Sequence, residues 1–310
     1  MSYKPPYNLT TKIVNLISLI SEEITKVEYS NQKITPKLRK INRIKTLSST
    51  LAIEGNFLGE EKITAILEGK RVLGKYDEIL EAKGAINAYK GLEDYRFDNI
   101  DDLLKAHKIM MSDIICDAGE LRNINVAVGN HIAPPFKVVP TLMSDLFEWL
   151  KNSEEHPLIS SSIFHYEFEF IHPFSDGNGR VGRLWQSVIL YSYKSVFNLI
   201  PIESIIKDNQ DNYYQAIENS NDLGKSTPFI EFMLEIILEA IQSSVKGSVK
   251  SSVKDKILEY VKQNPTITIK ELSEILELST RAIEKQMANL KKDNMLKRVG
   301  SARKGHWEII

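Results

Sequence analysis

The residues best suited to chemistry lie between Ile171 and Arg183, a stretch that combines a histidine, a carboxylate and two arginines. His172 can exchange a proton near neutral pH, because imidazole titrates there. The carboxylate of Asp176 is a ligand type that suits Mg²⁺. The guanidinium groups of Arg180 and Arg183 match the geometry of phosphate oxygens, and on a helix both can face one ligand. Together these residue types predict a phosphate-handling active site.

The backbone of the same stretch favours an anion site. Pro173 disfavours the α-helical conformation of the residue before it, so the apolar helix that reaches Ile171 should end there. Gly177 and Gly179 can adopt conformations closed to other residues, which lets successive N–H groups turn inward as an anion-binding nest. A second helix should begin near Gly179 with its positive dipole end toward the same ligand. The alternative is an ordinary glycine-rich loop between helices.

From His172 to Arg183 the sequence matches His-Pro-Phe-x-Asp-Gly-Asn-Gly-Arg-x-x-Arg without departure. This motif resembles the signature of Fic-domain enzymes, which transfer AMP from ATP to hydroxyl groups of proteins. The resemblance implies that His172 deprotonates the target hydroxyl and that Asp176 is a ligand of Mg²⁺. It also implies nucleotide contacts: the α-phosphate for Asn178 and the amides of Gly177 and Gly179, the β- and γ-phosphates for Arg180 and Arg183.

A second motif precedes the signature in the chain. Ser49 to Asn56 ends a predicted helix and resembles the inhibitory motif of some Fic proteins, in which a Ser or Thr is followed by three residues, a Glu and then Gly or Asn. Thr50 and Glu54 match at the required spacing. The resemblance implies that Glu54 lies against Arg183, where its carboxylate would replace an oxygen of the γ-phosphate. A surface glutamate at a helix end is the alternative.

A different chemistry is suggested by His165, Glu169 and His172, which lie at positions i, i+4 and i+7 of one helix face. Such a face could hold a metal in a hydrolase. This interpretation would leave Asp176 through Arg183 without a role, and the spacing differs from His-Glu-x-x-His. We therefore expect His165 and Glu169 to pack around the site.

Further along the chain, Tyr213, Tyr214 and Asn221 follow a predicted helix start. In Fic proteins a Tyr pair and a downstream Asn at this spacing line the adenine pocket, so the resemblance makes these residues its candidates. An aromatic residue of a helix core and a polar turn explain the same pattern equally well.

Helical spacing of apolar residues predicts a mainly α fold. Helices are expected at 8–29, 37–53, 62–67, 79–89, 100–115, 139–150, 160–171 and 227–241, with one each after Gly179 and Asp211. The exception is 121–136, where alternating residues and Gly129-Asn130 predict a β-hairpin. Gly119, Arg122, Val126 and Pro134-Pro135 resemble the approach and exit of the flap that in Fic proteins binds the target chain by strand-like pairing. A hairpin that packs on its own body is the alternative.

The C-terminal segment has a different character. Residues 242–253 repeat Ser-Val-Lys and suggest a linker or a frayed helix end. Beyond them, three helices and two short strands within 254–310 resemble a winged helix-turn-helix domain. In DNA-binding members Thr280, Arg281 and Lys285 would reach the major groove while Arg303 and Lys304 contact phosphates. Many winged helices bind proteins instead, and the sequence leaves both open.

Composition sets broader limits. The 310 residues allow two or three compact units, and a 42% hydrophobic, 26% charged composition is ordinary for a globular protein. The net charge of −1 hides an asymmetry, since 250–310 contains 13 Lys and Arg against 8 Asp and Glu. Cys116 is the single cysteine, so no intrachain disulfide can form and nothing indicates an oxidising compartment. No apolar run reaches membrane-spanning length, and we expect a cytoplasmic protein without a membrane partner.

The resulting prediction is a self-inhibited protein adenylyltransferase with four segments: a helical region with the inhibitory motif at 1–95, a Fic core at 96–241, a linker at 242–253 and a winged helix at 254–310. It would use ATP and Mg²⁺ and bind its target at the flap 121–136. The alternative is a DNA-binding regulator whose Fic core senses nucleotide. Dimers are common among similar proteins, so a homodimer is one of the partners considered, and the sequence leaves the oligomeric state open. The target and any reverse removal of AMP stay open.

Overall fold

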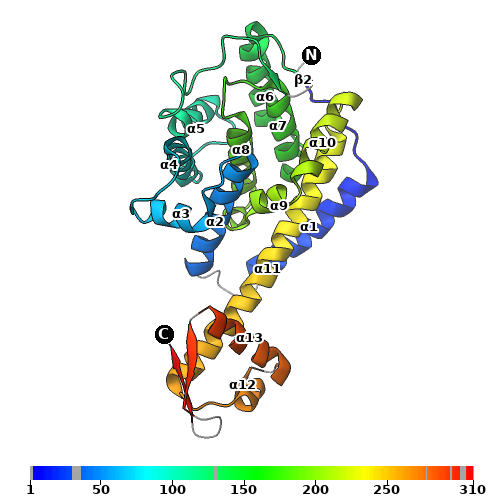
Figure 1. Cartoon of the computed structure of the whole chain (residues 1–310). Coiled ribbons are helices and arrows are strands. Elements are labelled where there is room, and N and C mark those ends of the chain that lie inside the picture. The colour runs from blue at the N-terminus through cyan, green and yellow to red at the C-terminus, as the bar shows by residue number, and fades with distance from the viewer. Residues whose placement is uncertain are drawn as a thin grey trace. The chain divides into compact units, whose positions relative to one another are not determined.

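The computed structural model describes residues 3–29, 36–128, 131–276, 278–293, 295–300 and 305–309. The chain divides into two compact units, Met1–Gln242 and Ser243–Ile310, which we describe separately. Helices dominate both units, as the apolar spacing predicts (Figure 1). None of the described helices is long and apolar enough to cross a membrane.

The first unit is built around α7 (Pro157–Ile171) and α8 (Asn178–Tyr193), which pack along each other. Nearly every side chain of α7 is buried, including Phe164, Phe168 and Ile171. A helix that is buried on all sides lies in the centre of a domain. The loop that joins these two helices is the predicted active-site stretch, so the most buried part of the unit positions it.

Other helices surround this central pair, and most of them lie close to the predicted ranges (Figure 1). They are α1 (Thr11–Tyr29), α2 (Pro36–Ile53), α3 (Gly59–Leu67), α4 (Tyr76–Lys90), α5 (Ile100–Met111), α6 (Val139–Asn152), α9 (Ile202–Asp208), α10 (Gln210–Leu223) and α11 (Thr227–Gln263), with 3₁₀ turns at Phe136–Val138 and Ser195–Leu199. The helix α2 begins at Pro36, where the fixed φ of proline suits a first turn. It ends at Ile53, directly before Glu54.

The predicted hairpin is present but short. Strands β1 (Ala127–Val128) and β2 (His131–Ile132) pair antiparallel, with Ala127 opposite Ile132 and Val128 opposite His131. The turn predicted at Gly129-Asn130 lies outside the described residues. The amide of Phe136 donates to the side-chain oxygen of Asn125 at 3.0 Å, which closes the base of the hairpin.

The second unit contains the end of α11, α12 (Ile269–Ile275), α13 (Thr280–Lys292), β3 (Leu296–Val299) and β4 (His306–Ile309), with β3 and β4 antiparallel. Its core includes Ile257, Leu272, Ile283, Met287 and Trp307. Ser279 caps α13, since its Oγ accepts a hydrogen bond from the amide of Ala282 at 3.3 Å. The wing residues 301–304, and with them the predicted phosphate contacts Arg303 and Lys304, lie outside the described residues.

The segment 242–253, which we expected as a linker, is helical and belongs to α11. It contains no proline and one glycine, so its Ser-Val-Lys repeats do not prevent a helix. The boundary between the two units falls at its first residues.

Candidate active site

The position of His172 follows from the end of α7. The helix stops at Ile171 as predicted, and the amide of His172 donates to the carbonyl of Phe168 at 2.9 Å. His172 itself has φ 51° and ψ 62°, in the left-handed region, and is the one described non-glycine residue with positive φ. That conformation costs roughly 1–2 kcal/mol, and strain of this kind often marks a functional site. Neighbouring contacts must therefore hold the backbone of His172.

The loop after His172 is held by its own side chains. Asn178 accepts from the amide of Phe174 at 2.9 Å and donates to the same residue's carbonyl at 3.0 Å. Gly177, with φ 83°, precedes α8 in a conformation that disfavours a Cβ. Asn178 thus shapes the loop in this structure, and its contact with an α-phosphate stays a prediction.

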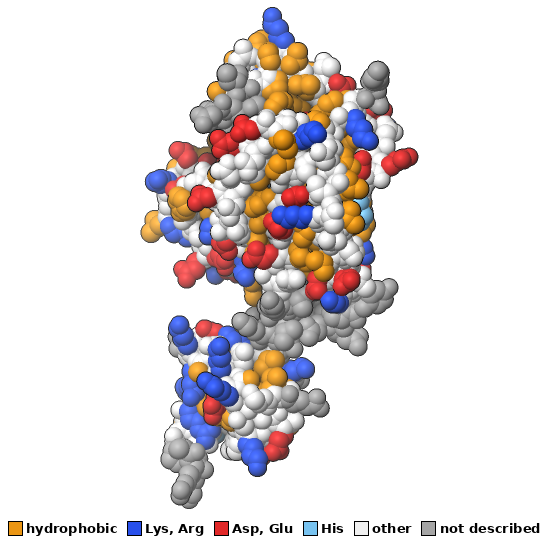
Figure 2. All heavy atoms as spheres, turned by 90° about the vertical axis from the view of Figure 1, so that its right-hand side faces the viewer, with side chains coloured by type: hydrophobic (Ala, Val, Ile, Leu, Met, Phe, Trp, Pro, Cys, Tyr) orange, Lys and Arg blue, Asp and Glu red, His pale blue; other side chains and the backbone are white. Residues whose placement is uncertain are grey.

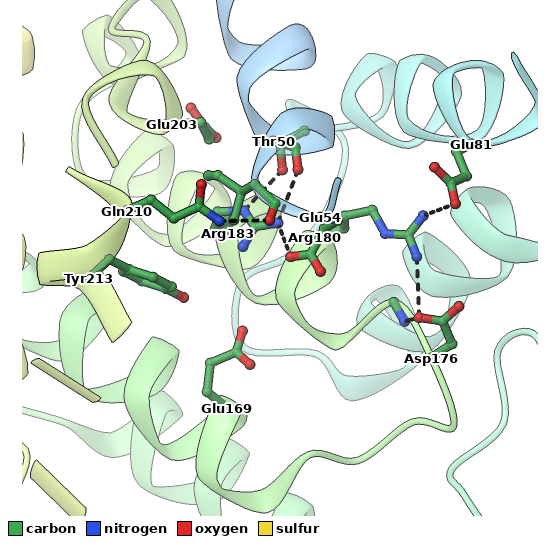
Figure 3. A network of polar contacts seen from close by, with 12 residues as sticks. Thr50, Glu54, Glu81, Glu169, Asp176, Arg180, Arg183, Glu203, Gln210 and Tyr213 are labelled. Carbon is green, nitrogen blue, oxygen red and sulfur yellow. Dashed lines mark hydrogen bonds and ion pairs between the residues drawn. The ribbon is translucent and has the colours of Figure 1, made fainter. Parts of the chain in front are cut away.

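Asp176 and Arg180 form the outer part of the site. Asp176 Oδ1 accepts from the amide of Gly177 at 2.6 Å and lies 3.3 Å from Nη2 of Arg180. Nη1 of Arg180 lies 3.8 Å from Oε1 of Glu81 on α4, and the side-chain Nδ2 of Asn56 donates to Oε2 of Glu81 at 2.8 Å. Arg180 therefore bridges two carboxylates (Figure 3). The sequence contained no signal for Glu81, because its partners are distant in the chain.

This set of donors suits a Mg²⁺ ion that binds together with a nucleotide. The Asp176 side chain is 55% exposed and so can offer carboxylate oxygen to solvent. The described residues contain no group of three or more His, Cys, Asp and Glu side chains that could enclose a metal. Mg²⁺ commonly binds through one or two carboxylates, several waters and substrate phosphates. One accessible carboxylate beside two arginines suits that mode.

Arg183 forms the inner part of the site and contacts the end of α2. Its Nη2 donates to Oε1 of Glu54 at 2.6 Å and to the carbonyl of Thr50 at 3.2 Å, while Nε donates to Oγ1 of Thr50 at 3.1 Å. The structure thus places Thr50 and Glu54 against Arg183 (Figure 3). The Arg183 side chain is 1% exposed, so an unpaired charge there would be costly.

The positive charge of Arg183 keeps Glu54 ionised. Partial burial would raise its pKa, but Arg183, with smaller contributions from Arg180 and His172, lowers the pKa below the usual value. Burial likewise disfavours the charge of Arg183, and Glu54 more than restores it, so the pKa of Arg183 is raised. Both groups are charged at neutral pH, and protonation does not separate them there.

The structure gives a different reason for a glycine at position 179 from the one expected from the sequence. It lies within α8 and is absent from the glycines with positive φ. A Cβ at this position would collide with Oε1 of Glu54 and come within 3.0 Å of Nη1 of Arg183. Gly179 therefore makes room for the carboxylate to reach the arginine. The left-handed conformation expected for both glycines holds for Gly177 alone.

Behind Arg183 lies a buried polar cluster. His165 Nδ1 donates to Gln186 Oε1 at 2.6 Å, and His165 Nε2 accepts from the hydroxyl of Tyr213 at 3.0 Å. Burial lowers the pKa of His165 to about 3, so the ring is neutral. Glu169 Oε1, 3.8 Å from His165 Nε2, has no hydrogen-bond partner among the described residues, and burial raises the pKa of Glu169 to about 7. His165 and Glu169 thus pack behind the site, as expected.

The three candidates for an adenine pocket lie on α10 but differ in environment. Tyr213 is buried against His165, whereas Tyr214 is 47% exposed. Asn221 accepts a hydrogen bond from the hydroxyl of Tyr166 at 2.9 Å. Gln210, which the sequence did not single out, donates to the carbonyl of Ile53 at 3.0 Å and so connects α10 to the residue before Glu54. The adenine contacts of the three candidates stay a prediction.

Comparisons with known proteins identify the family. A model described as the Fic/DOC family matches residues 97–190. The crystal structure of a Fic family protein from Desulfovibrio desulfuricans is 38% identical in sequence, covers 99% of this chain and 98% of its own, and superposes with a TM-score of 0.78. The chain belongs to the Fic family. Fic-1 from C. elegans shares the fold, at 24% identity, a TM-score of 0.63, and coverage of 78% of this chain and 72% of its own.

Curated relatives of this Fic protein include the protein adenylyltransferase Fic of Culex quinquefasciatus, 30% identical over 206 residues, which are 62% of this chain and 39% of that protein. The protein adenylyltransferase fic-1 of Caenorhabditis elegans is 28% identical over 242 residues, 72% of this chain and 46% of its own length. The chain therefore spans less than half the length of these relatives. A model described as an HTH domain matches residues 253–306, in the second unit, where a winged helix is predicted.

Proposed function

We propose that this Fic protein is a protein adenylyltransferase, which transfers AMP from ATP to a Ser, Thr or Tyr hydroxyl of a target protein. The observation that supports this most is the pair of buried guanidinium groups beside the loop after His172. Arg180 and Arg183 are each held by carboxylates contributed by other elements. Two such arginines beside a helix N-terminus form a site for a polyphosphate. Relatives named as protein adenylyltransferases support the same reaction.

In this proposal the residues of the loop and of the start of α8 have separate roles. His172 accepts the proton of the target hydroxyl as that oxygen attacks the α-phosphorus, and pyrophosphate leaves. Arg180 and Arg183 bind the β- and γ-phosphates and hold the leaving group in line with the attacking oxygen. Asp176 would hold Mg²⁺ together with the phosphates, and the ion would supply positive charge that offsets the charge of the triphosphate. Most of the rate in such a transfer comes from positioning and charge stabilisation.

Glu54 restrains the reaction in the resting protein. Its carboxylate takes the side of Arg183 that a γ-phosphate would need, and the two anions compete for one guanidinium fork. ATP bound beside Glu54 would be turned so that its α-phosphorus is out of line with the target oxygen. The 2.6 Å contact between Glu54 and Arg183 supports this proposal.

The target chain is proposed to add to the hairpin of β1 and β2. Residues 127–128 and 131–132 pair with each other on one side, so each has an outer edge that can pair with an extended peptide. Backbone pairing places few demands on the sequence of the target. Such binding suits the modification of a loop on another protein.

The test is incorporation of label from α-labelled ATP into the purified protein and into a cell lysate. Wild type should label weakly, Glu54→Gly strongly, and Glu54→Gly/His172→Ala not detectably. Label from γ-labelled ATP should not appear in protein, because the β- and γ-phosphates leave. Incorporation from γ-labelled ATP alone would show phosphoryl transfer and contradict the proposal.

A second function, duplex DNA binding, is supported by the second unit. Figure 2 shows Lys and Arg side chains gathered on the visible face of this unit. The exposed face of α13 includes Arg281, Lys285, Lys291 and Lys292, although Glu284 lies among them. Lys291 and Arg298 pack over the ring of Trp307 at 4.9 and 4.6 Å, so they stabilise the fold as well. Arg281 and Lys285, at the start of α13, are the best candidates for DNA contacts.

A further inference from the structure

Arg122 is a buried arginine whose partners are backbone carbonyl groups. Its Nε donates to the carbonyl of His172 at 2.7 Å, and Nη2 reaches the carbonyl of Ile171 at 3.3 Å. Nη1 donates to the carbonyl of Ile124 at 2.7 Å, and Nη2 also donates to the carbonyl of Pro134 at 2.5 Å. Ile124 and Pro134 are the two ends of the hairpin segment, whereas Ile171 and His172 end α7. One side chain therefore connects both ends of the flap to the residue that would be the catalytic base.

Backbone and ring contacts extend this connection to the other end of the loop. The amide of Arg122 donates to the carbonyl of Pro173 at 2.9 Å. The amide of Gly119 donates to Nδ1 of His107 at 2.8 Å, so the proton of the neutral ring lies on Nε2, which donates to the carbonyl of Asp176 at 3.0 Å. Residues 119–124 are thus bonded directly to His172 and, through His107, to Asp176.

The chemistry of the contact requires an arginine. The guanidinium group offers five N–H donors in a rigid planar fork, and here they are directed at carbonyls on both sides. Among the described residues no carboxylate is paired with Arg122 in an ion pair or hydrogen bond. Burial lowers the pKa of Arg122, yet a guanidinium group stays charged in proteins. A buried charge held by carbonyls of two segments binds them more firmly than a neutral donor would.

We propose that Arg122 is a positioning residue that joins the target-binding flap and the catalytic loop into one cooperative unit. This inference rests on the proposed function for its catalytic consequence. A target held on the flap has its hydroxyl placed relative to β1 and β2, while the proton acceptor is placed by the strained backbone of His172. The guanidinium group of Arg122 keeps the flap and the backbone of His172 at a constant separation. Arg122 also donates to the carbonyl of His172, the residue with positive φ, and so helps to hold that backbone conformation.

The cooperative unit can be tested in the unmodified protein by native-state hydrogen exchange at low denaturant concentrations. Amides in 119–125 and in 168–174 should open with one free energy and one denaturant dependence, because the same bonds hold both. Amides of α1 serve as the reference for a separate region. Separate opening free energies for the two segments would overturn the proposal, and this result does not depend on any enzymatic activity.

The role of the fork is tested with Arg122→Lys, which keeps the charge and loses the planar donors. The matched control is Arg96→Lys, because Arg96 is exposed and has its ion pair with Asp98. Exchange in both 119–125 and 168–174 should quicken in Arg122→Lys and stay unchanged in Arg96→Lys. Faster exchange in 119–125 alone, with 168–174 still protected, would show that Arg122 does not hold the loop.

Activity gives a readout that a merely structural role would not produce. In a Glu54→Gly background, Arg122→Lys should lower the self-labelling rate at saturating ATP roughly 10- to 100-fold, since misplacement by about 1 Å has effects of that size. The ATP concentration for half-maximal rate should stay within about twofold, because Arg122 contacts none of the proposed nucleotide ligands. A weakened ATP response at an unchanged maximal rate would overturn the positioning role. If Glu54→Gly itself does not label, the transferase proposal fails while hydrogen exchange still decides the coupling.

Discussion

Oε1 of Glu54 lies 2.6 Å from Nη2 of Arg183, although the two residues are 129 positions apart in the chain. One comes from the end of α2 and the other from the first turns of α8. The contact forms because Gly179 leaves space for the carboxylate and Thr50 holds the other side of the guanidinium group. A carboxylate at this place presents negatively charged oxygens to the guanidinium group, as a phosphate would. The resting site therefore already contains a substitute for the group it is proposed to bind.

Removing this substitute should release activity. Glu54→Gly should raise self-labelling from α-labelled ATP strongly, by at least about tenfold, with a smaller change in ATP affinity, since positioning contributes more than binding. The double variant Glu54→Gly/Arg183→Ala should stay low, because the anchor for the γ-phosphate is then missing. The measurement is label per mole of protein over time.

Glu54→Gln is the matched control, since it keeps the shape of the side chain and removes its charge. It should fall between wild type and Glu54→Gly, because a neutral amide binds a guanidinium group less strongly than a carboxylate does. Equal labelling by wild type and Glu54→Gly would contradict self-inhibition.

The next prediction concerns the base and the metal ligand. In the Glu54→Gly background, His172→Ala should lower transfer by roughly 10²–10⁴, the usual cost of losing a general base, and leave ATP binding in calorimetry nearly unchanged. Asp176→Ala should instead weaken ATP binding in the presence of Mg²⁺ more than in its absence. The exposed His306 offers a control, since His306→Ala should change neither. Unchanged transfer by His172→Ala would remove its assignment as the base.

The catalytic loop could be predicted from sequence because its determinants are local. His172, Pro173 and the residues to Arg183 form one continuous motif, and the proline and glycines act on their immediate neighbours. The Glu54 contact was predictable from a second motif of fixed spacing. The loop contains residue types that physical chemistry associates with phosphate, whereas the Glu54 contact was expected only because Ser49 to Asn56 resembles an inhibitory motif.

The residues that hold the loop could not be predicted in the same way. Glu81, Gln210 and His107 lie on helices whose periodicity resembles any amphipathic helix, and their partners are distant in the chain. The role of Gly179 was mistaken for the same reason, since what excludes a side chain there is Glu54 from another helix. The continuous helix through 242–253 was not predicted, because low-complexity composition suggested a linker or a frayed helix end even where nothing breaks a helix.

DNA binding by the second unit predicts a salt-dependent interaction of the full-length protein. Arg281→Ala/Lys285→Ala should weaken binding and reduce the slope of log affinity against log salt by up to about 2, because two cations proposed to enter the major groove would no longer neutralise the charge of the duplex. Arg71→Ala/Lys75→Ala, an exposed pair at the same spacing in the first unit, should leave the slope unchanged. Filter retention of labelled duplex over a range of salt concentrations gives these slopes. Absence of retention at low salt would favour docking of a protein instead.

The last prediction uses Glu169, whose side chain is 12% exposed beside the neutral His165. Burial raises its pKa from 4.5 to about 7; Arg183 opposes this shift and Glu54 adds to it. Between these two values the unfolded chain has released a proton that the folded protein still holds. The free energy of unfolding therefore falls as pH rises from about 4.5 to 7, and it is not further changed by this group above that range. The full effect is about 3 kcal/mol, from a shift of this size.

Glu169→Gln should remove this penalty, because an amide does not ionise. Relative to wild type, the variant should gain about 2–3 kcal/mol in unfolding free energy between pH 5 and pH 8. Urea unfolding at the two pH values measures the gain, and Glu239→Gln, an exposed residue of α11, is the control that should show none. A difference between Glu169→Gln and wild type that is the same at both pH values would show that Glu169 is already ionised at pH 5. The ionised carboxylate would then compete with Glu54 for Arg183, so removing it would strengthen the contact between Arg183 and Glu54.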